Sequence, residues 1–358
     1  METTMQSKIS RHPWLIRTLC ILLAMMLVAA AVAVMTPILT PKYVTNFPEG
    51  SLTGEYYAAA AEVSHDVLFV GDCEVYESFV PAVLWEEYGI SSYVRGGAQQ
   101  LVWHSYYLLE DALRYETPKV VVFNVLALKY GTPQREGYNR LALDGMEWSS
   151  VKVDAIRASM TDEEDFLTYV FPFFRYHSRW SELSSEDFRY AFADKPLVSD
   201  SGYLMQTGIV PHDPTKDQPP EAPSDYTLPA TAMDYLDRMT ALCRDKGIEL
   251  ILVKAPTNSW HYHWFDEWDD QIVAYAEKNG LSYYNFIDDA DAIGLDMTTD
   301  SYDGGIHLNV YGAEKFTRYF GQILADTNRV PDRRVETATA AVWQTRVDRY
   351  NARKTVGT

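Results

Sequence analysis

Cys73 stands at the end of an apolar run in the stretch VLFVGDCEVYESF, residues 67–79. The run ends in Gly71 and Asp72, and the residues after Cys73 are typical of the first turns of a helix. A strand that ends in a sharp turn and presents a nucleophile at the start of a helix is one way to build an active site. A thiolate there can attack a carbonyl carbon, and a helix N-terminus with a neighbouring histidine lowers the pKa of a thiol. The alternative is that Cys73 only fills the turn.

His307 is the candidate base for this nucleophile. It lies in TTDSYDGGIHLNVYGAEKF, residues 298–316, behind two glycines and before a predicted helix. A cysteine nucleophile needs a base that takes its proton, and the base needs a polar group that orients its ring. Asp303 is the first candidate for that group and Asp300 is the second. The alternative is that His307 is a loop histidine without a catalytic role.

Two further strand ends carry residues that suit an oxyanion hole. Gly96 and Gly97 end one predicted strand, and Asn124 ends another. Acyl transfer needs N–H donors aimed at the oxygen that becomes negative in the transition state. We expect the N–H of Cys73, the N–H of Gly96 and the side chain of Asn124 to supply them. The alternatives are turn glycines and an asparagine that caps its strand.

The elements that position these residues alternate between strand and helix. Apolar runs predict strands at 67–71, 91–95, 119–125, 248–256 and 281–286. Helical patterns occupy the connections, including 233–246 and a last helix over 309–326. Such alternation predicts an α/β fold with a parallel sheet and helices on both faces. Cys73, Gly96 and Asn124 all fall at carboxyl ends of strands, where ligands bind in such sheets.

The pattern also predicts a domain organisation. Residues 1–41 form a cytoplasmic N-terminus and a transmembrane anchor, and residues 42–62 form a stalk. Residues 63–330 form the α/β domain, with a mostly helical insertion over 131–227. Residues 331–358 are predicted to form a C-terminal amphipathic helix.

The N-terminal segment RTLCILLAMMLVAAAVAVMTPILTPK holds no charge between Arg17 and Lys42. About 20 apolar residues cross a bilayer, so this run is long enough for a transmembrane helix. Lys8, Arg11 and Arg17 precede or begin it, which places the N-terminus on the cytoplasmic side and the remainder outside the cytoplasm. The alternative is a cleaved signal peptide, because small residues occur at 31–33.

Composition excludes one class of partner. The formal net charge of −19 argues against nucleic-acid binding, because few groups here would neutralise phosphates.

His261 and His263 could ligate a metal, but no third ligand has suitable spacing, so no metal site is expected. Cys73 lies at a turn after a strand, whereas Cys243 lies inside a helical pattern. A disulfide bridge between them is therefore less favoured than two free thiols. The aromatic stretch YVFPFFRYHSRW (169–180) is expected in a core; an acyl or sugar pocket and membrane docking are the alternatives.

Four blocks in order along the chain resemble the SGNH (GDSL-type) hydrolase and acyltransferase superfamily. They are GDC at 71–73, RGG at 95–97, FNV around Asn124 and DGGIHLN at 303–309. The resemblance covers residues 63–326 without the insertion. It implies a three-layer, flavodoxin-like parallel sheet and ester chemistry with a nucleophile, a late histidine and aspartate, and an oxyanion hole completed by a glycine and an asparagine.

Carried onto this sequence, the resemblance implies Cys73 as nucleophile, His307 as general base and Asp303 as its orienting group. Gly96 and Asn124 would complete the oxyanion hole. Two departures are visible. The nucleophile of the family is serine, and the aspartate usually lies three residues before the histidine, where this chain has Gly304.

The anchored, outward-facing layout resembles the branch of this superfamily that modifies cell-envelope polymers, including the D-alanyl transfer protein of teichoic acid modification and polysaccharide O-acetylation proteins. The resemblance implies a membrane-anchored, extracytoplasmic acyltransferase or acyl-ester hydrolase. Its substrate would be a cell-envelope polysaccharide or polymer, and its partner a membrane acyl-donor protein. No cofactor is expected, and the sequence does not indicate substrate-binding residues. The alternatives are an inactive scaffold that binds a glycan or a partner, and a thiol redox protein, against which the absence of CxxC speaks.

Overall fold

The computed structural model describes residues 13–42, 48–193, 195–217, 221–258 and 262–357. The chain forms two compact units. The first consists of residues 1–48 and 165–195, and the second of residues 49–164 and 196–358.

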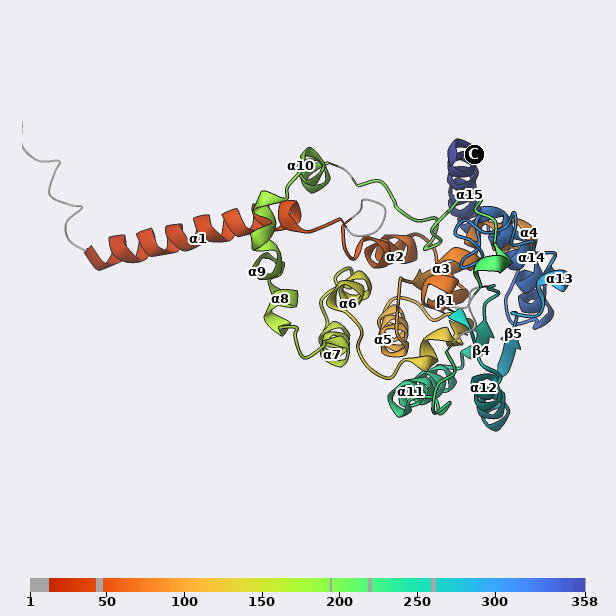
Figure 1. The fold of residues 1–358 in the computed structure, drawn as a ribbon. Helices are drawn as coiled ribbons and strands as arrows, with labels where there is room; N and C mark the ends of the chain where they lie inside the picture. Colours follow the sequence, from red (N-terminus) through yellow and green to blue (C-terminus); the bar gives the residue numbers. More distant parts are fainter. Residues whose placement is uncertain (1–12, 43–47, 194, 218–220, 259–261, 358) are drawn as a thin grey trace, which may run out of the picture. The chain divides into compact units, whose positions relative to one another are not determined.

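A five-stranded parallel sheet forms the centre of the second unit (Figure 1). Its strands are β1 (Val67–Gly71), β2 (Ser92–Gly96), β3 (Val120–Asn124), β4 (Glu249–Lys254) and β5 (Ser282–Asn285). Their order in space is β2-β1-β3-β4-β5, with every pair of neighbours parallel. This is the flavodoxin-like order, so the predicted fold class is confirmed. The chain runs from β1 to β2 on one side and then to β3 on the other, which places the topological switch point between β1 and β3.

Helices cover both faces of the sheet (Figure 1). One group packs together and consists of α4 (Pro81–Tyr88), α14 (Val310–Asp326) and α15 (Thr337–Gly357). The other consists of α5 (Val102–Ala112), α11 (Ala230–Lys246) and α12 (Asp266–Asn279). The other helical elements of this unit are α2 (Ser51–Glu62), α3 (Cys73–Ser78), η2 (Val125–Lys129), α6 (Glu136–Leu143), α7 (Ser150–Ser159), η4 (Pro214–Lys216) and α13 (Ala290–Ile293).

The sequence explains why the strands and the helices of the site begin and end where they do. Every residue of β1, β2 and β3 is buried, as expected for parallel strands that are covered on both faces. Asp72 accepts a hydrogen bond from the backbone N–H of Glu74 and so caps α3. Asn309 caps α14 in the same way through Tyr311 and Gly312. The two helices that flank the candidate site therefore begin at defined residues.

The first unit is helical. The apolar segment forms α1 (Pro13–Leu39), which is long and apolar enough to cross a membrane. The last turn of α1 packs against a group of short helices from the middle of the chain. These are α9 (Pro172–Tyr176), η3 (His177–Ser181) and α10 (Ser185–Phe192), while α8 (Phe166–Val170) packs against α9.

The structure corrects the predicted stalk and insertion. Residues 51–62 of the predicted stalk form α2, which belongs to the α/β unit and contacts β2 and α6. The reason is Tyr56, which is fully buried beneath the guanidinium of Arg95. The predicted insertion, residues 131–227, is not one body, because only residues 165–195 join α1. The rest of it packs with the sheet unit, since α7 contacts α5.

The tail and the cysteines complete the second unit. Helix α15 lies within the region expected to form a C-terminal helix, and its Trp343 is fully buried and stacks on Trp85 of α4. Cys73 and Cys243 are both free thiols, so the two residues form no bridge.

Candidate active site

Cys73 is the first residue of α3, and Asp72 alone separates it from the end of β1 at Gly71. The backbone at Gly71 packs closely against α3 and β3. An added Cβ there would come within 2.5 Å of the Val75 side chain and 3.0 Å of the Asn124 Cβ. Only glycine therefore lets the strand turn this tightly into the helix. The turn places the thiol at the carboxyl edge of the sheet, next to the switch point between β1 and β3.

Asp303 holds the imidazole of His307 in a defined orientation. Its Oδ2 lies 2.7 Å from Nδ1 of the ring, and its Oδ1 accepts the backbone N–H of His307 at 2.8 Å. Asp300, the second candidate, is instead 2.7 Å from the Lys315 ammonium and accepts the backbone N–H of Asp296. The extra residue between Asp303 and His307 is thus accommodated in the loop, where Gly304 has a φ of 82° and Gly305 a φ of 94°.

A neighbouring segment fixes this loop in place. Backbone N–H groups of Val210 and Gly304 donate to the carbonyls of Ser301 and Val210, respectively. His212 lies with Nδ1 2.9 Å from the Gly304 carbonyl oxygen. Residues 201–212 come from the predicted insertion, and this part of it positions the loop that carries His307.

The free ring nitrogen of His307 is left for Cys73. Nδ1 is occupied by Asp303, and Nε2 is buried without a hydrogen-bond partner of regular geometry among the described residues. The two side chains are close enough for each to change the pKa of the other. Burial lowers the pKa of His307, but the hydrogen bond to Asp303, the nearby Cys73 thiol and the charge of Glu77 outweigh burial and raise it to about 11.

The thiol is less acidic than the sequence suggested. Cys73 is only 6% exposed, and burial is the main reason that its pKa is raised. The carboxylate of Asp72 raises this pKa further, and His307 offsets only part of the increase. Helix α3 has six residues, so its dipole is small. His307 does lower the thiol pKa, as expected, but burial outweighs this effect and the net shift is upward.

Tyr262 covers the thiol and the base together. The thiol of Cys73 donates a hydrogen bond to the Tyr262 hydroxyl at 3.4 Å. The Tyr262 ring packs edge-on against His307, with ring centroids 5.3 Å apart. Tyr302 also stacks on the imidazole, with ring centroids 6.0 Å apart and an interplanar angle of 14°. Two aromatic rings therefore pack against the base.

Glu77 is a second carboxylate at the same base, and it lies one helical turn after Cys73 on α3. Its Oε2 is 3.4 Å from Nδ1 of His307, while Oε1 accepts a hydrogen bond from the Tyr302 hydroxyl at 2.8 Å. Glu77 is 3% exposed, and burial raises its pKa to about 7. Two carboxylates therefore stabilise the positive charge of the imidazolium.

Asn124 belongs to a buried polar network under the nucleophile. Its Nδ2 donates to Asp72 at 3.1 Å and to Glu74 at 2.8 Å, and its Oδ1 accepts the N–H of Ala255. Both amide hydrogens are thus engaged within the protein. The oxyanion role of Asn124 stays a prediction. It requires Asn124 to break its hydrogen bond to Asp72 or to Glu74, so that this N–H can point at the substrate oxygen.

The charge in this network is balanced by Lys254, the last residue of β4. Its ammonium donates to both oxygens of Glu74, at 2.6 and 2.9 Å, and neither side chain is more than 2% exposed. Burial and the charge of Glu74 raise the pKa of Asp72 to about 7, and the charge of Lys254 offsets only part of this increase. The network ties α3 to β3 and β4 through charge-assisted hydrogen bonds.

Gly96 permits the close approach of β2 to the nucleophile turn. An added Cβ would lie 3.2 Å from the Asp72 carbonyl oxygen and 3.3 Å from the Tyr76 Cβ. The N–H of Gly97 donates to the Gly71 carbonyl at 3.3 Å. Of the two glycines, Gly96 therefore remains the candidate oxyanion donor, and its role stays a prediction.

The sequence did not reveal the roles of Glu77 and Lys254 or the contact between Tyr262 and the thiol. Glu77 follows Cys73 by four residues, the spacing that places two side chains on one helix face. Lys254 interrupts an otherwise apolar strand at its carboxyl end, which was a signal for a buried ion pair. His263, one of the two histidines considered as metal ligands, packs on Phe265. His261 lies outside the described residues.

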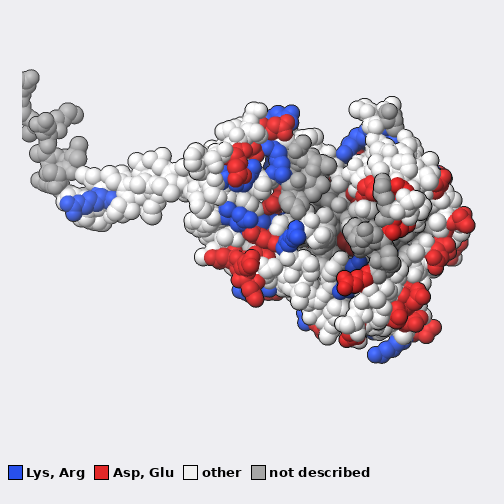
Figure 2. Space-filling model, viewed as in Figure 1, with Lys and Arg blue, Asp and Glu red and all other residues white. Residues whose placement is uncertain are grey.

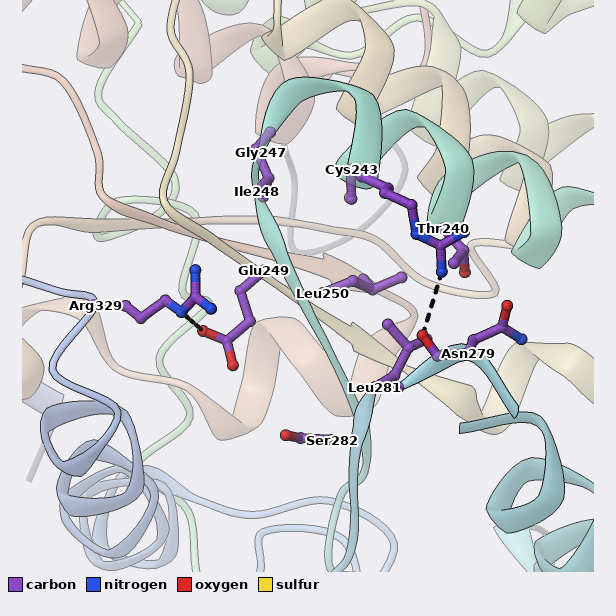
Figure 3. A pocket seen from close by; sticks show the side chains of 12 residues that line it. Thr240, Cys243, Gly247, Ile248, Glu249, Leu250, Asn279, Leu281, Ser282 and Arg329 are labelled. Carbon is purple, nitrogen blue, oxygen red and sulfur yellow. Dashed lines mark hydrogen bonds and ion pairs between the residues drawn. The ribbon is translucent and has the colours of Figure 1, made fainter. Parts of the chain in front are cut away.

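A separate open cleft of about 300 Å³ lies at the amino ends of β4 and β5 (Figure 3). Its arginines are already engaged, since Arg329 pairs with Glu249 at 2.9 Å and Arg244 donates to the Asn279 carbonyl at 3.2 Å. Cys73 and His307 are not among the residues that line it. We therefore place the chemistry at the opposite, carboxyl edge of the sheet.

Comparisons with known proteins give similarity in structure only. No family model matches the sequence, and no curated protein matches it. Among solved structures, a protein described as lipolytic and of the G-D-S-L family from Desulfitobacterium hafniense has 13% identity and a TM-score of 0.34. The alignment covers 72% of this chain and 98% of that one.

Two structures from Bacteroides give comparable values. A GDSL-like lipase from Bacteroides thetaiotaomicron has 12% identity and a TM-score of 0.36, with coverage of 78% of this chain and 100% of that chain. A protein described as an acylhydrolase from Bacteroides fragilis has 11% identity and a TM-score of 0.38, with coverage of 78% and 99%, respectively. The assignment of chemistry therefore rests on the geometry of Cys73, His307 and Asp303.

Proposed function

We propose that this chain is a membrane-anchored acyltransferase or acyl-ester hydrolase with Cys73 as its nucleophile. The observation that carries the proposal is the arrangement of His307. Asp303 occupies Nδ1 at 2.7 Å, and the buried Nε2 remains for the thiol at the end of β1. A nucleophile, a base and an orienting carboxylate in this relation are the parts that covalent acyl transfer requires.

The reaction would proceed in two balanced steps. His307 takes the thiol proton, and Sγ of Cys73 attacks the carbonyl carbon of an acyl ester. A C–S bond forms, the C–O bond to the alcohol breaks, and His307 returns the proton to the alcohol oxygen. In the second step a water or sugar hydroxyl gives its proton to His307 and attacks the thioester. The C–S bond then breaks, and the proton returns to the thiol.

The protonation states of Cys73 and His307 before substrate binds decide the pH at which the enzyme can work. At neutral pH the thiol of Cys73 is protonated, and His307 carries a positive charge because its pKa is raised. The imidazolium must lose its proton before it can act as a base. We therefore expect turnover to increase as pH rises above neutrality.

The location of the substrate is also part of the proposal. Helix α1 is long enough to span the bilayer, and Arg17 lies at its N-terminal end. With the N-terminus in the cytoplasm, the sheet unit would lie outside it. The acceptor would then be a hydroxyl of a cell-envelope polysaccharide or polymer, and the acyl group would arrive from a donor protein in the membrane.

The test uses full-length protein with p-nitrophenyl acetate. We expect release of nitrophenol and, after an acid quench, an acetyl adduct on Cys73 detected by mass spectrometry. Cys73→Ala should lose both, while Cys243→Ala, at a buried position in α11, should retain both. Unchanged turnover in Cys73→Ala would falsify the assignment.

Three observations favour a second candidate, a binding module without turnover. The thiol of Cys73 is buried, its pKa is raised, and both amide hydrogens of Asn124 are engaged. On that reading the carboxyl edge of the sheet binds a glycan or a partner. Wild-type protein that forms no acetyl adduct at any pH up to about 10, where free thiols are ionised, would support this candidate.

A further inference from the structure

The exposure of α1 changes sharply along its length. From Trp14 to Val34 its large apolar side chains other than the half-buried Val32 are exposed, whereas Ile38 and Leu39 are buried. At 1.5 Å per residue the exposed part is about 30 Å long, close to the thickness of the hydrocarbon core. Figure 2 shows this helix white except for blue near its N-terminal end. The covered end therefore begins where a bilayer core would end.

The helices of residues 165–195 cover that end. Arg179 of η3 donates to the carbonyl oxygen of Leu39 at 2.5 Å. Asp187 of α10 lies 2.7 Å from the ammonium of Lys42, and both side chains are at most 10% exposed. These contacts bind α9, η3 and α10 to the last turn of α1 within one compact unit.

The same short helices expose large apolar side chains. Outside α1, fourteen such residues are exposed in the described part of the chain, and six of them fall within residues 166–192. We call these six the exposed apolar set: Leu167, Phe171, Phe174, Trp180, Phe188 and Phe192. Their exposure ranges from 48% for Phe188 to 71% for Trp180. A soluble surface rarely gathers so many large apolar groups in one short segment without a partner.

Helix α10 has three faces with different surroundings. At about 100° per residue, Phe188 and Phe192 share one face. Asp187 lies on the face that is turned to α1 and Lys42, and Glu186 lies on the side opposite Phe188. One side of α10 therefore contacts protein, one is apolar and exposed, and one is charged and exposed, which is the pattern of a helix at a membrane surface.

We propose that the exposed apolar set inserts into the outer boundary of the bilayer and docks the residue 165–195 helices on the lipid surface. The partner of this set is lipid, because the set belongs to the same compact unit as α1. It lies on the short helices next to the point where the exposed, membrane-length part of α1 ends. Tryptophan favours the headgroup level, and Trp, Phe and Leu are the residues that interfacial helices bury at the boundary between headgroups and acyl chains. The inference rests on the proposed anchoring by α1 and is independent of the chemistry of Cys73.

The experiment compares two labels on one helix of the full-length chain. In a Cys20→Ser, Cys73→Ala, Cys243→Ala background, Phe188→Cys and Glu186→Cys are each labelled with the fluorophore NBD. Each protein is reconstituted into liposomes of phosphatidylethanolamine and phosphatidylglycerol. Retention after a carbonate wash tests the anchor separately, and nitroxide lipids with the quencher near the headgroup test contact with lipid.

We expect the label at position 188 to emit at shorter wavelength and to lose fluorescence with the nitroxide lipids, while the label at 186 remains water-exposed and unquenched. Equal, water-like emission at both positions in carbonate-resistant protein would overturn the inference while leaving the anchor intact. A shifted but unquenched label at 188 would also overturn it, because the set would then pack on protein. Loss of protein in the wash would instead show that the anchoring itself is wrong.

Discussion

Glu77 Oε2 lies 3.4 Å from Nδ1 of His307, the same nitrogen that Asp303 contacts at 2.7 Å. The two carboxylates come from different parts of the chain, since Glu77 is on the nucleophile helix and Asp303 is in the loop before α14. Both favour the imidazolium, but only Asp303 also accepts the backbone N–H of His307. The two residues should therefore differ in what their removal does.

Glu77→Gln should shift the pH dependence of turnover without abolishing activity. The Glu77 carboxylate raises the pKa of His307, so its removal lowers that pKa and increases the fraction of neutral base at pH 8. The rising limb of the pH–rate profile should move to lower pH. Asp303→Asn also lowers the pKa but loses the orienting contact, so kcat should fall by roughly 10² to 10⁴, the usual contribution of a positioned base. Equal effects of the two variants would contradict the distinction.

Alkylation of Cys73 by iodoacetamide should titrate above the range of a free thiol. Burial and Asp72 raise its pKa, and His307 opposes them in part. In His307→Ala the opposing interaction is lost, so the apparent pKa should rise further and the rate at pH 8 should fall. The measurement is the rate of adduct formation from pH 6 to about 11 by mass spectrometry. A wild-type thiol that titrates below about 8.5 would show that burial does not dominate.

Tyr262→Ala should make Cys73 more reactive toward iodoacetamide. The Tyr262 ring and hydroxyl cover the thiol, whose exposure is only 6%. Removal of the ring admits water, which stabilises the thiolate and lowers the thiol pKa. Tyr262→Phe keeps the ring against His307 and serves as the matched control, so its alkylation rate should stay closer to that of the wild type. Alkylation that is no faster in Tyr262→Ala than in Tyr262→Phe would mean that the ring does not cover the thiol.

Lys254→Met should destabilise the sheet unit by about 3 to 5 kcal/mol, because it leaves the carboxylate of Glu74 buried without its cation. The double variant with Glu74→Gln should recover much of that loss, since neither charge then remains. Urea unfolding of the full-length chain in detergent, followed by circular dichroism, measures both. A double variant as unstable as the sum of the two single variants would show that the pair is not energetically coupled.

The strands, their order of appearance and the residues at their ends are properties of the sequence alone. The uninterrupted apolar runs at 67–70 and 120–123 can be buried on both faces, and this predicts a parallel sheet. Parallel strands align their carboxyl ends, so Cys73, Gly96 and Asn124 were expected along one edge. Cys73 and Asn124 do meet through Asp72, because both flank the switch point between β1 and β3. The apolar length of α1 was equally visible in the composition.

Only the tertiary structure decided which side chains pair with one another and how strongly each is buried. Asp303 rather than Asp300 contacts His307, because the loop geometry and the competing ammonium of Lys315 select between them. Glu74 and Lys254 are 180 residues apart, and they meet because β3 brings α3 and β4 together. The thiol pKa depends on how completely the surrounding groups exclude water. Burial of this kind sums contacts from distant segments, so no local pattern in the sequence could predict its sign.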